Sequence, residues 1–379
     1  MVVQAAASLP VALHRVPSSR GAAEGPAAGA CHRLPARAST RTSLKHHKRQ
    51  QRQASPCRSA AGAGVATTAP TTDVEAPDAA AIWEAFAASV SGEWEGVTAS
   101  FNPDGSPIPL PEYYVPQAYR DWGVELFDWQ SQSSVLADSQ GVSATCRRMM
   151  PTVGCEADAI AFMQEAAQLF STAPGSQPAT AAPDGSYSAG PADISSADLR
   201  KVAFEHCLAL PAEGPQQQRM RLRVVQQLRR GAASGGWRLD SVELHSERYD
   251  SPYRGKLELS GCGGGMKGFA SSEALPADAL AGAWQVASGL RYQVDPTSGA
   301  CSCSAAQPGE RWEAGSLQGV LLHPLRAWSA CSMGDQDGGD VSLAAGVLLG
   351  EGGARMAVAV RRLAGGRLAS VELLTLERA

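Results

Sequence analysis

The sequence contains no apolar run long enough to cross a membrane as a helix. Such a helix needs about 20 mostly apolar residues, and none of the 379 residues belongs to a stretch of that kind. A secreted disulfide framework is missing as well, because the nine cysteines are irregularly spaced and two of them, Cys31 and Cys57, lie within the first 72 residues. We therefore expect no transmembrane segment and mostly reduced cysteines.

The signatures of common catalytic and metal sites are also missing. Only His206, His245 and His323 follow residue 72, and neither a Gly-x-Ser-x-Gly motif nor a phosphate-binding loop is present. The Cys-Ser-Cys run at 301–303 lacks zinc-ligand spacing, and the acidic run at 335–340 lacks the last carboxylate of a calcium loop. We predict no catalytic residue, no metal and no cofactor.

Acidic residues are almost absent from residues 1–72, which carry ten Lys and Arg but only one acid, Glu24. This segment is rich in Ala, Ser, Thr and Arg and has no continuous apolar core, a composition typical of organelle transit peptides. The alternative is a basic disordered arm that binds RNA or membrane. We predict a disordered transit peptide over residues 1–72 and a chloroplast location, in the stroma or peripheral to the thylakoid, with the mitochondrion as the alternative.

The remainder of the chain has the opposite charge. It carries 23 Lys and Arg against 36 Asp and Glu, a net charge near −13. A negative body repels phosphate and disfavours non-specific nucleic-acid binding. We expect no nucleic-acid partner, and the sequence does not indicate any protein partner.

Short strand patterns dominate after residue 80. We predict a first β-barrel domain over residues 80–270 and a second over 275–379, because closely spaced Gly-rich turns favour a closed antiparallel meander. Within the first domain, helical spacing predicts a helix over 158–170. The Ala-, Pro-, Ser- and Gly-rich stretch at about 172–196 predicts a disordered insertion.

Each domain opens with a Gly-x-Trp triplet, Gly92-Glu93-Trp94 and Gly282-Ala283-Trp284. These triplets resemble the first-strand signature of the calycin/lipocalin superfamily. The longer run SGEWEGVTASFNPDGSP with VPQAYRDWGVELFDWQ resembles an uncharacterised plastid and cyanobacterial family with two calycin-like halves. The resemblance implies a mainly β fold of two tandem antiparallel barrels, in which Trp94 and Trp284 each close one end.

A barrel of about eight strands can enclose one small ligand. The predicted mouth and wall of the first barrel are aromatic: Tyr113, Tyr114, Tyr119, Trp122 and Trp129. The basic residues Arg147, Arg221 and Arg223 become candidates to bind a ligand carboxylate if they point inward, since Arg binds carboxylate through two parallel hydrogen bonds. The alternative places Arg221 and Arg223 on a solvent face, which their alternation with apolar residues favours.

Three functions stay open from the sequence. The first is a plastid protein that binds a small hydrophobic or amphipathic ligand, such as a pigment, tetrapyrrole, fatty acid or oxylipin, inside a barrel. The second is a lyase or isomerase that acts on such a ligand, which predicts a carboxylate beside a Tyr or Arg with a perturbed pKa. The third is a structural or assembly factor with plugged barrels, which predicts an exposed apolar patch. Of these, the non-catalytic binding protein is our preferred reading.

Overall fold

The fold is taken from a computed structural model. It describes residues 77–149, 162–171, 178–213, 217–231, 235–255, 266–295, 297–313, 317–334 and 339–379. The predicted transit peptide, residues 1–72, lies outside the described residues. The described part is mainly β and forms two antiparallel sheets of eight strands each, as the sequence predicts. No helix in these ranges is both long and apolar enough to cross a membrane.

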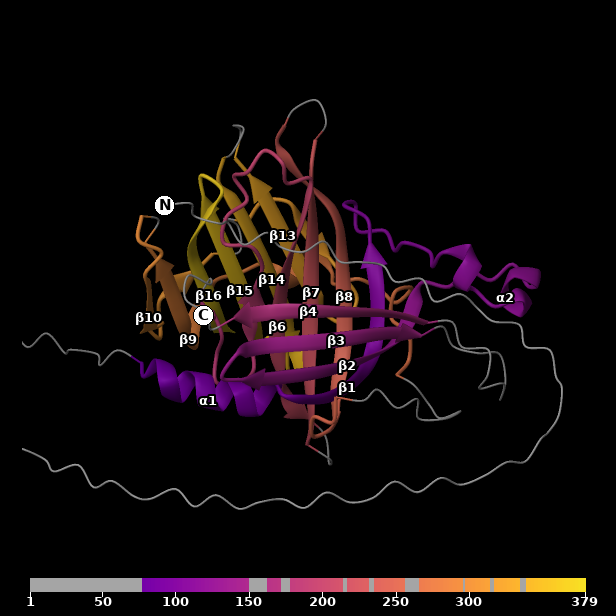
Figure 1. The fold of residues 1–379 in the computed structure, drawn as a ribbon, viewed down its shortest axis with the longest axis horizontal. Helices are drawn as coiled ribbons and strands as arrows, with labels where there is room; N and C mark the ends of the chain where they lie inside the picture. The colour runs from indigo at the N-terminus through magenta and orange to yellow at the C-terminus, as the bar shows by residue number, and fades with distance from the viewer. Residues whose placement is uncertain are drawn as a thin grey trace, which may run out of the picture. The chain divides into compact units, whose positions relative to one another are not determined.

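The first sheet has the strand order β4-β3-β2-β1-β8-β7-β6-β5. Its strands are β1 (Gly92–Phe101), β2 (Asp128–Asp138), β3 (Gly141–Met149), β4 (Phe162–Ser171), β5 (Tyr187–Ala189), β6 (Lys201–Glu213), β7 (Gln218–Arg230) and β8 (Trp237–Ser251). The sheet curls until its two edge strands approach each other, with the rings of Phe170 on β4 and Tyr187 on β5 only 5.8 Å apart between centroids. Figure 1 shows β2, β3 and β4 crossing in front of β6, β7 and β8. The sheet is therefore a nearly closed barrel with a seam between β4 and the short β5.

The second sheet follows in the chain and has the order β10-β9-β16-β15-β14-β13-β12, with β11 paired to β9. Its strands are β9 (Trp284–Val294), β10 (Cys301–Ala305), β11 (Arg311–Trp312), β12 (Val320–Leu322), β13 (Ala327–Met333), β14 (Val341–Leu349), β15 (Arg355–Ala364) and β16 (Arg367–Arg378). Its long hairpins agree with the antiparallel strands and Gly-rich turns expected for this domain. For example, Gly365 and Gly366 connect β15 to β16 with φ of 56° and 79°, values that Gly adopts without strain.

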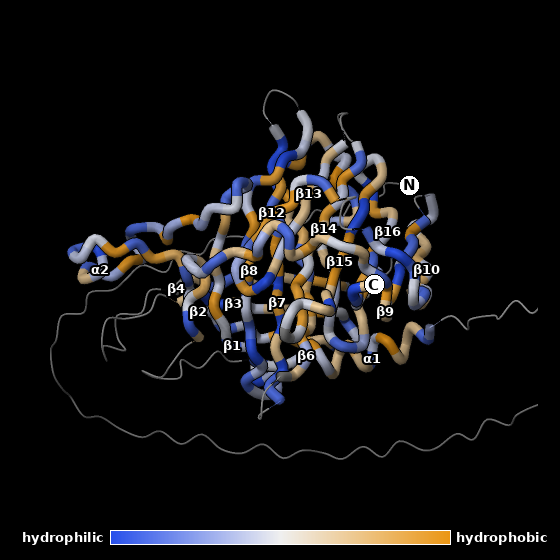
Figure 2. Tube along the Cα trace, turned by 180° about the vertical axis from the view of Figure 1, so that it is seen from behind, coloured by the Kyte–Doolittle hydropathy of each residue, from blue (hydrophilic) through white to orange (hydrophobic). Residues whose placement is uncertain are grey.

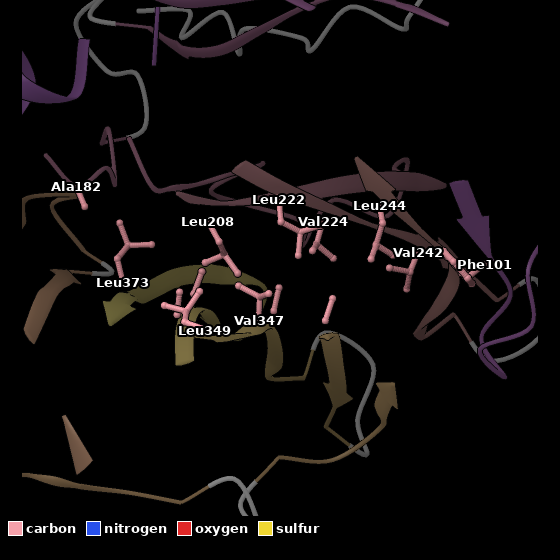
Figure 3. Packing of buried hydrophobic residues seen from close by; sticks show 14 of the residues in the cluster. Phe101, Ala182, Leu208, Leu222, Val224, Val242, Leu244, Val347, Leu349 and Leu373 are labelled. Carbon is pink, nitrogen blue, oxygen red and sulfur yellow. The ribbon is translucent and has the colours of Figure 1, made fainter. Parts of the chain in front are cut away.

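Both sheets bury one face against the other. Leu222, Val224 and Leu244 of the first sheet belong to the same hydrophobic cluster as Val347 and Leu373 of the second. Figure 3 shows these side chains pointing toward one another between the two sets of strands. This packing uses only one face of each strand, so the alternate residues of β7 and β8 point into the first barrel.

Within the residues that the structure describes, four short helical segments and one longer helix flank the strands. They are α1 (Ala79–Val90), η1 (Glu112–Tyr114), α2 (Gln117–Asp121), η3 (Ala277–Leu280) and η5 (Glu351–Gly353). Helix α1 begins at the N-cap Asp78, whose side chain accepts from the backbone N–H of Ala80 at 2.9 Å. Its buried Phe86 meets the rings of Phe170 and Tyr187, so α1 covers one end of the barrel. Helix α2 lies on an arm that extends away from the strands (Figures 1 and 2).

Two sequence predictions in the first sheet are wrong. The helix expected over 158–170 is strand β4 from Phe162 onward, because pairing with β3 overrides the local helical spacing. The described part of the expected disordered insertion, residues 178–196, includes strand β5 and the fully buried Ile194. Composition suggested disorder there, but a few apolar side chains suffice to anchor the segment on both sheets.

Candidate functional site

Alternation along β7 and β8 fills the first barrel with charged side chains. Leu222 and Val224 pack between the sheets, so Arg221 and Arg223 turn inward. Neighbouring strands add charges at the same levels, and all their side chains meet in ion pairs. We call this group the interior charge cluster: Arg148, Glu165, Glu205, Arg221, Arg223, Glu243, His245 and Glu247.

Glu247 is the centre of the deeper half of the cluster. Its carboxylate accepts from Arg221 Nε at 2.6 Å, from Arg223 Nη1 at 2.9 Å and from the Ser133 hydroxyl at 2.7 Å. Arg223 also donates through Nε to Glu205 at 2.7 Å. One buried carboxylate therefore joins two arginines, and a second carboxylate holds one of them from the other side.

Glu243 is the centre of the shallower half. It accepts from Arg148 Nη2 at 2.7 Å and lies 2.7 Å from His245 Nε2. The other ring nitrogen of His245, Nδ1, lies 2.8 Å from the Thr98 hydroxyl. Arg148 Nη2 reaches Glu165 as well, at 3.2 Å. Arg148 thus connects the shallower half to edge strand β4, and the two halves act on each other through the charges that they place in the same barrel interior.

The cluster holds its charges at neutral pH. Burial acts to raise the pKa of Glu243, but the positive charge of Arg148 and the interaction with His245 outweigh it and hold that pKa at about 2. The pKa of Glu247 is also far below its usual value, since Arg221 and Arg223 overcome the effect of burial. Both carboxylates are therefore ionised at physiological pH.

Arg148 and Glu165 are the most exposed members of the cluster. The Glu247 side chain is 1% exposed and that of Glu243 is 6% exposed, whereas Arg148 and Glu165 reach 15% and 39%. The seam of the barrel runs beside β4, where Glu165 lies. A molecule from solvent would therefore meet Arg148 and Glu165 before any other member of the cluster.

Trp94 contacts the deeper half of the cluster. The guanidinium of Arg221 stacks on its ring at 3.9 Å, and the indole Nε1 donates to the Val90 carbonyl at 3.1 Å. Trp284 has the same arrangement in the second sheet, donating to the Leu280 carbonyl at 3.1 Å beneath Arg378 at 4.7 Å. The two Gly-x-Trp tryptophans therefore occupy equivalent positions in the two sheets. The expectation that each of them closes one end of a barrel stays a prediction.

Aromatic side chains gather toward the other end of the first barrel. Trp129 forms a small buried cluster, which we call the aromatic cap, with Leu110, Val115, Tyr114, Tyr119, Leu126 and Met163. The ring of Tyr114 meets that of Trp129 edge-on at 5.1 Å. Of the five aromatic residues expected at the mouth, the structure brings Tyr114, Tyr119 and Trp129 together. Tyr113 and Trp122 pack on the outside of this group, with ring centroids 4.3 Å from Tyr114 and 5.9 Å from Tyr119, and are 74% and 65% exposed on the arm.

The arginines expected to bind a ligand divide between the two faces of the barrel wall. Arg221 and Arg223 are 3% and 8% exposed, so the expected solvent face is wrong: the apolar residues between them pack against the second sheet instead. Arg147 lies on the outer face, where its Nε donates to Gln164 at 2.8 Å. Its neighbour Arg148 is the one that points inward.

Sequence reasoning missed the acidic half of the cluster. Glu243, His245 and Glu247 occupy alternate positions of β8, and Val242 and Leu244 lie on its opposite face. A strand with ionisable residues on one face and apolar residues on the other usually faces water with its polar side. One signal in the sequence could have revealed that the polar face of β8 is buried. Arg221 and Arg223 alternate in the same way on the neighbouring strand β7, so they place positive charges beside the carboxylates of β8. No group of three or more His, Cys, Asp or Glu in the described ranges is arranged to hold a metal ion.

Comparisons with known proteins give little beyond this geometry. No protein-family model matches the chain, and no curated protein matches it. Among solved structures, the chain is similar to a protein of unknown function from the DUF3598 family of Nostoc punctiforme, with 18% identity and a TM-score of 0.44. That similarity covers 78% of this chain and 98% of the Nostoc chain.

Proposed function

We propose that the first barrel binds an amphipathic small molecule whose anionic head pairs with Arg148 and whose apolar part lies on the aromatic cap. One observation carries the proposal. Arg148 on β3 is the direct register partner of Met163 on β4, and Met163 belongs to the aromatic cap. A partly exposed guanidinium therefore lies beside a mainly apolar, aromatic surface, which is the combination that an amphipathic anion requires.

A ligand anion that enters the cluster has to replace one of its carboxylates, and the charges and exposure of the cluster indicate which one. Four carboxylates already face three guanidinium groups in the cluster, so an added anion fits only if it replaces one of them. Glu165 is the most exposed of the four and lies on an edge strand. An ion pair that exposed contributes little to stability. A ligand carboxylate can therefore replace Glu165 on Arg148 while Glu243 keeps its own contact.

We further propose that the protein is a calycin-like plastid protein and that its ligand is a pigment, tetrapyrrole, fatty acid or oxylipin. The nearly closed barrel supports the fold, and the composition of residues 1–72 supports the location. A fluorescent protein fused to the C-terminus of the full-length chain should accumulate in chloroplasts. Fluorescence in mitochondria would indicate the alternative organelle, and cytosolic fluorescence would contradict the transit peptide.

Binding is tested with laurate, dodecanol and dodecylamine, which share one alkyl chain and differ in head charge. We expect calorimetry on the full chain to show the tightest binding for laurate. Arg148→Gln should weaken laurate binding about ten- to a hundredfold, since it removes a charged hydrogen bond worth about 1.5–3 kcal/mol. Glu165→Gln should strengthen it, because its neutral amide competes less for Arg148.

Arg147→Gln is the matched control, because it removes the neighbouring charge from the outer face of the same strand. It should leave laurate binding within about twofold of the wild-type value, an energy near RT ln 2. An equal loss of laurate affinity in the Arg147 and Arg148 variants would show that only the overall charge of the protein matters, and would contradict a specific role for Arg148. Equal affinity for laurate, dodecanol and dodecylamine would contradict the proposal that the site recognises an anionic head group.

The enzyme alternative receives less support from the cluster. Glu205 does lie beside Tyr187 and Arg223, the arrangement that a catalytic site predicts. However, burial and the Glu205 charge raise the pKa of Tyr187 well above its usual value, while Arg223 overcomes burial to lower the pKa of Glu205. General acid–base groups act best when their pKa lies near the working pH. These shifts move both groups away from it.

The assembly alternative is favoured by one specific feature, the exposed apolar surface of the arm. Tyr113, Trp122 and Val124 are 74%, 65% and 43% exposed there. Exposed aromatic residues on a projecting segment are a common mark of protein interfaces. The double change Tyr113→Ser and Trp122→Ser should abolish any association with a partner protein and leave the protein folded. Association that survives this change would contradict the arm as the interface.

A further inference from the structure

The inner face of the second sheet changes from apolar to polar along its strands. At one end, Trp284, Trp328 and Met356 form a fully buried cluster with their neighbours. At the other end, the strands β13 to β16 surround an open depression with a volume of about 460 Å³. This volume is typical of small-molecule sites. The depression is separate from the interior charge cluster of the first barrel.

A row of polar side chains crosses the depression at a single level. Ser332 on β13 pairs in register with Ser342 on β14, Ser342 pairs with Arg362 on β15, and Arg362 pairs with Ser370 on β16. Each of them continues the alternation of residues that belong to the inner apolar cluster, so all four lie on the inner face. Strands lie about 4.8 Å apart, so the row is roughly 14 Å long, about the length of two linked sugar rings.

The serine hydroxyls of this row are available to a ligand. Within residues 317–334 and 339–379, none of the three has a hydrogen-bond partner, although Ser370 is only 8% exposed. Each hydroxyl can donate one hydrogen bond and accept two. With no protein partner, each hydroxyl is free to bond to water or to a ligand that enters the depression. The row therefore favours a ligand that both donates and accepts.

The charges around the depression already balance one another. Arg362 Nη1 donates to Glu372 at 2.9 Å, and Glu372 also accepts from Arg291 Nε at 3.1 Å. Asp340 lines the same depression and accepts from the backbone N–H of Gly365 at 3.1 Å. An anionic ligand would meet the carboxylate of Asp340 and would compete with Glu372 for Arg362. A cationic ligand would meet the guanidinium of Arg362.

We propose that this depression binds a neutral, hydroxyl-rich molecule of mono- or disaccharide size. Its hydroxyl groups would bond to the row of Ser332, Ser342, Arg362 and Ser370, and Asp340 would accept from one of them. The site is independent of the first barrel and its ligand. The same chemistry is offered by a free sugar and by the sugar head of a glycolipid.

Saturation-transfer NMR on the full chain tests the proposal with maltose, lactose and cellobiose, and with inorganic phosphate and laurate for comparison. We expect transfer to at least one disaccharide. The double variant Ser342→Ala and Ser370→Ala should weaken that binding about tenfold, the usual effect of two neutral hydrogen bonds. Ser304→Ala, on the exposed strand β10, is the matched control and should bind like the wild type. Circular dichroism checks that all variants are folded.

Octyl maltoside, used below its micelle concentration, separates the two ligand sources. Affinity equal to that of maltose assigns the site to a free sugar, and clearly tighter binding assigns it to a glycolipid head. The proposal is overturned if no disaccharide shows transfer. It is equally overturned if the Ser304 control loses as much as the double variant, or if phosphate is the molecule that depends on Ser342 and Ser370.

Discussion

Replacing Glu247 by Gln should destabilise the protein strongly. Its carboxylate is 1% exposed and neutralises both Arg221 and Arg223. Removing one partner of a buried ion pair costs about 3–5 kcal/mol, because the remaining charges stay buried without compensation. We expect about 3 kcal/mol for Glu247→Gln, since the amide oxygen still accepts one hydrogen bond. A domain is stable by only about 5–15 kcal/mol, so this loss is easily measured.

Urea unfolding followed by tryptophan fluorescence measures the change, with Glu95→Gln as the control. Glu95 is 31% exposed and pairs with Arg248, which is 33% exposed, so this variant should lose less than about 1 kcal/mol. If the Glu247 variant loses no more than the Glu95 variant, the cluster does not stabilise the barrel as we describe. A loss of stability that is confined to Glu247→Gln supports a stabilising role for the buried ion pairs of the interior charge cluster.

Acid titration of the same proteins adds an independent check. Glu243 has a pKa of about 2 in the folded state and an ordinary value of 4.5 when unfolded. Its contribution, roughly 3 kcal/mol, is therefore present above pH 4.5 and is lost as the pH falls from 4.5 toward 2. Glu247 adds to the loss in the same direction. Stability of Glu247→Gln should consequently fall less steeply with acid than that of the wild type.

Three further outcomes are expected. His206 is fully buried, and burial lowers its pKa to about 3, so the folded protein loses stability as the pH falls from 6.5 toward 3 and the buried ring has to be protonated. Between pH 7 and pH 4, the His206→Leu variant should therefore lose roughly 3 kcal/mol less stability than the wild type. Parallel curves of stability against pH for the two proteins would contradict this. A Cβ at Gly346 would lie 2.4 Å from the Trp328 ring, so Gly346→Ala should lower stability by about 2 kcal/mol, which an unchanged melting temperature would refute. Iodoacetamide should modify exposed Cys301 before Cys207, whose pKa burial raises to about 12; equal rates by mass spectrometry would disprove the buried thiol.

Local sequence signals predicted the second sheet well because its structure is mostly local. Hairpins there join neighbours in sequence, and Gly at positive φ marks the turn between β15 and β16. The same reasoning failed at β4, where helical spacing was present but the segment pairs as an edge strand. Pairing of β4 with β3 depends on the rest of the sheet, which a short sequence window does not contain.

The candidate site was only partly predictable. Trp129, Arg221 and Arg223 were recognised by residue type, yet alternation suggested that the two arginines face water. A strand with polar residues on one side is ordinarily half exposed. Here the apolar side is covered by a second sheet and the polar side by the closing barrel, so both faces are buried.

The sequence by itself determined the mainly β class, the Gly-rich turns between antiparallel strands and the contrast between a basic N-terminal segment and an acidic body. These properties follow from residue type and short-range spacing. Only the tertiary structure decided which side of each strand is enclosed. That choice placed Arg148 inward and Arg147 outward, joined Glu243 and Glu247 to arginines of other strands, and aligned three serines across β13, β14 and β16. Such pairings depend on the closure and packing of whole sheets, which strand periodicity alone does not specify.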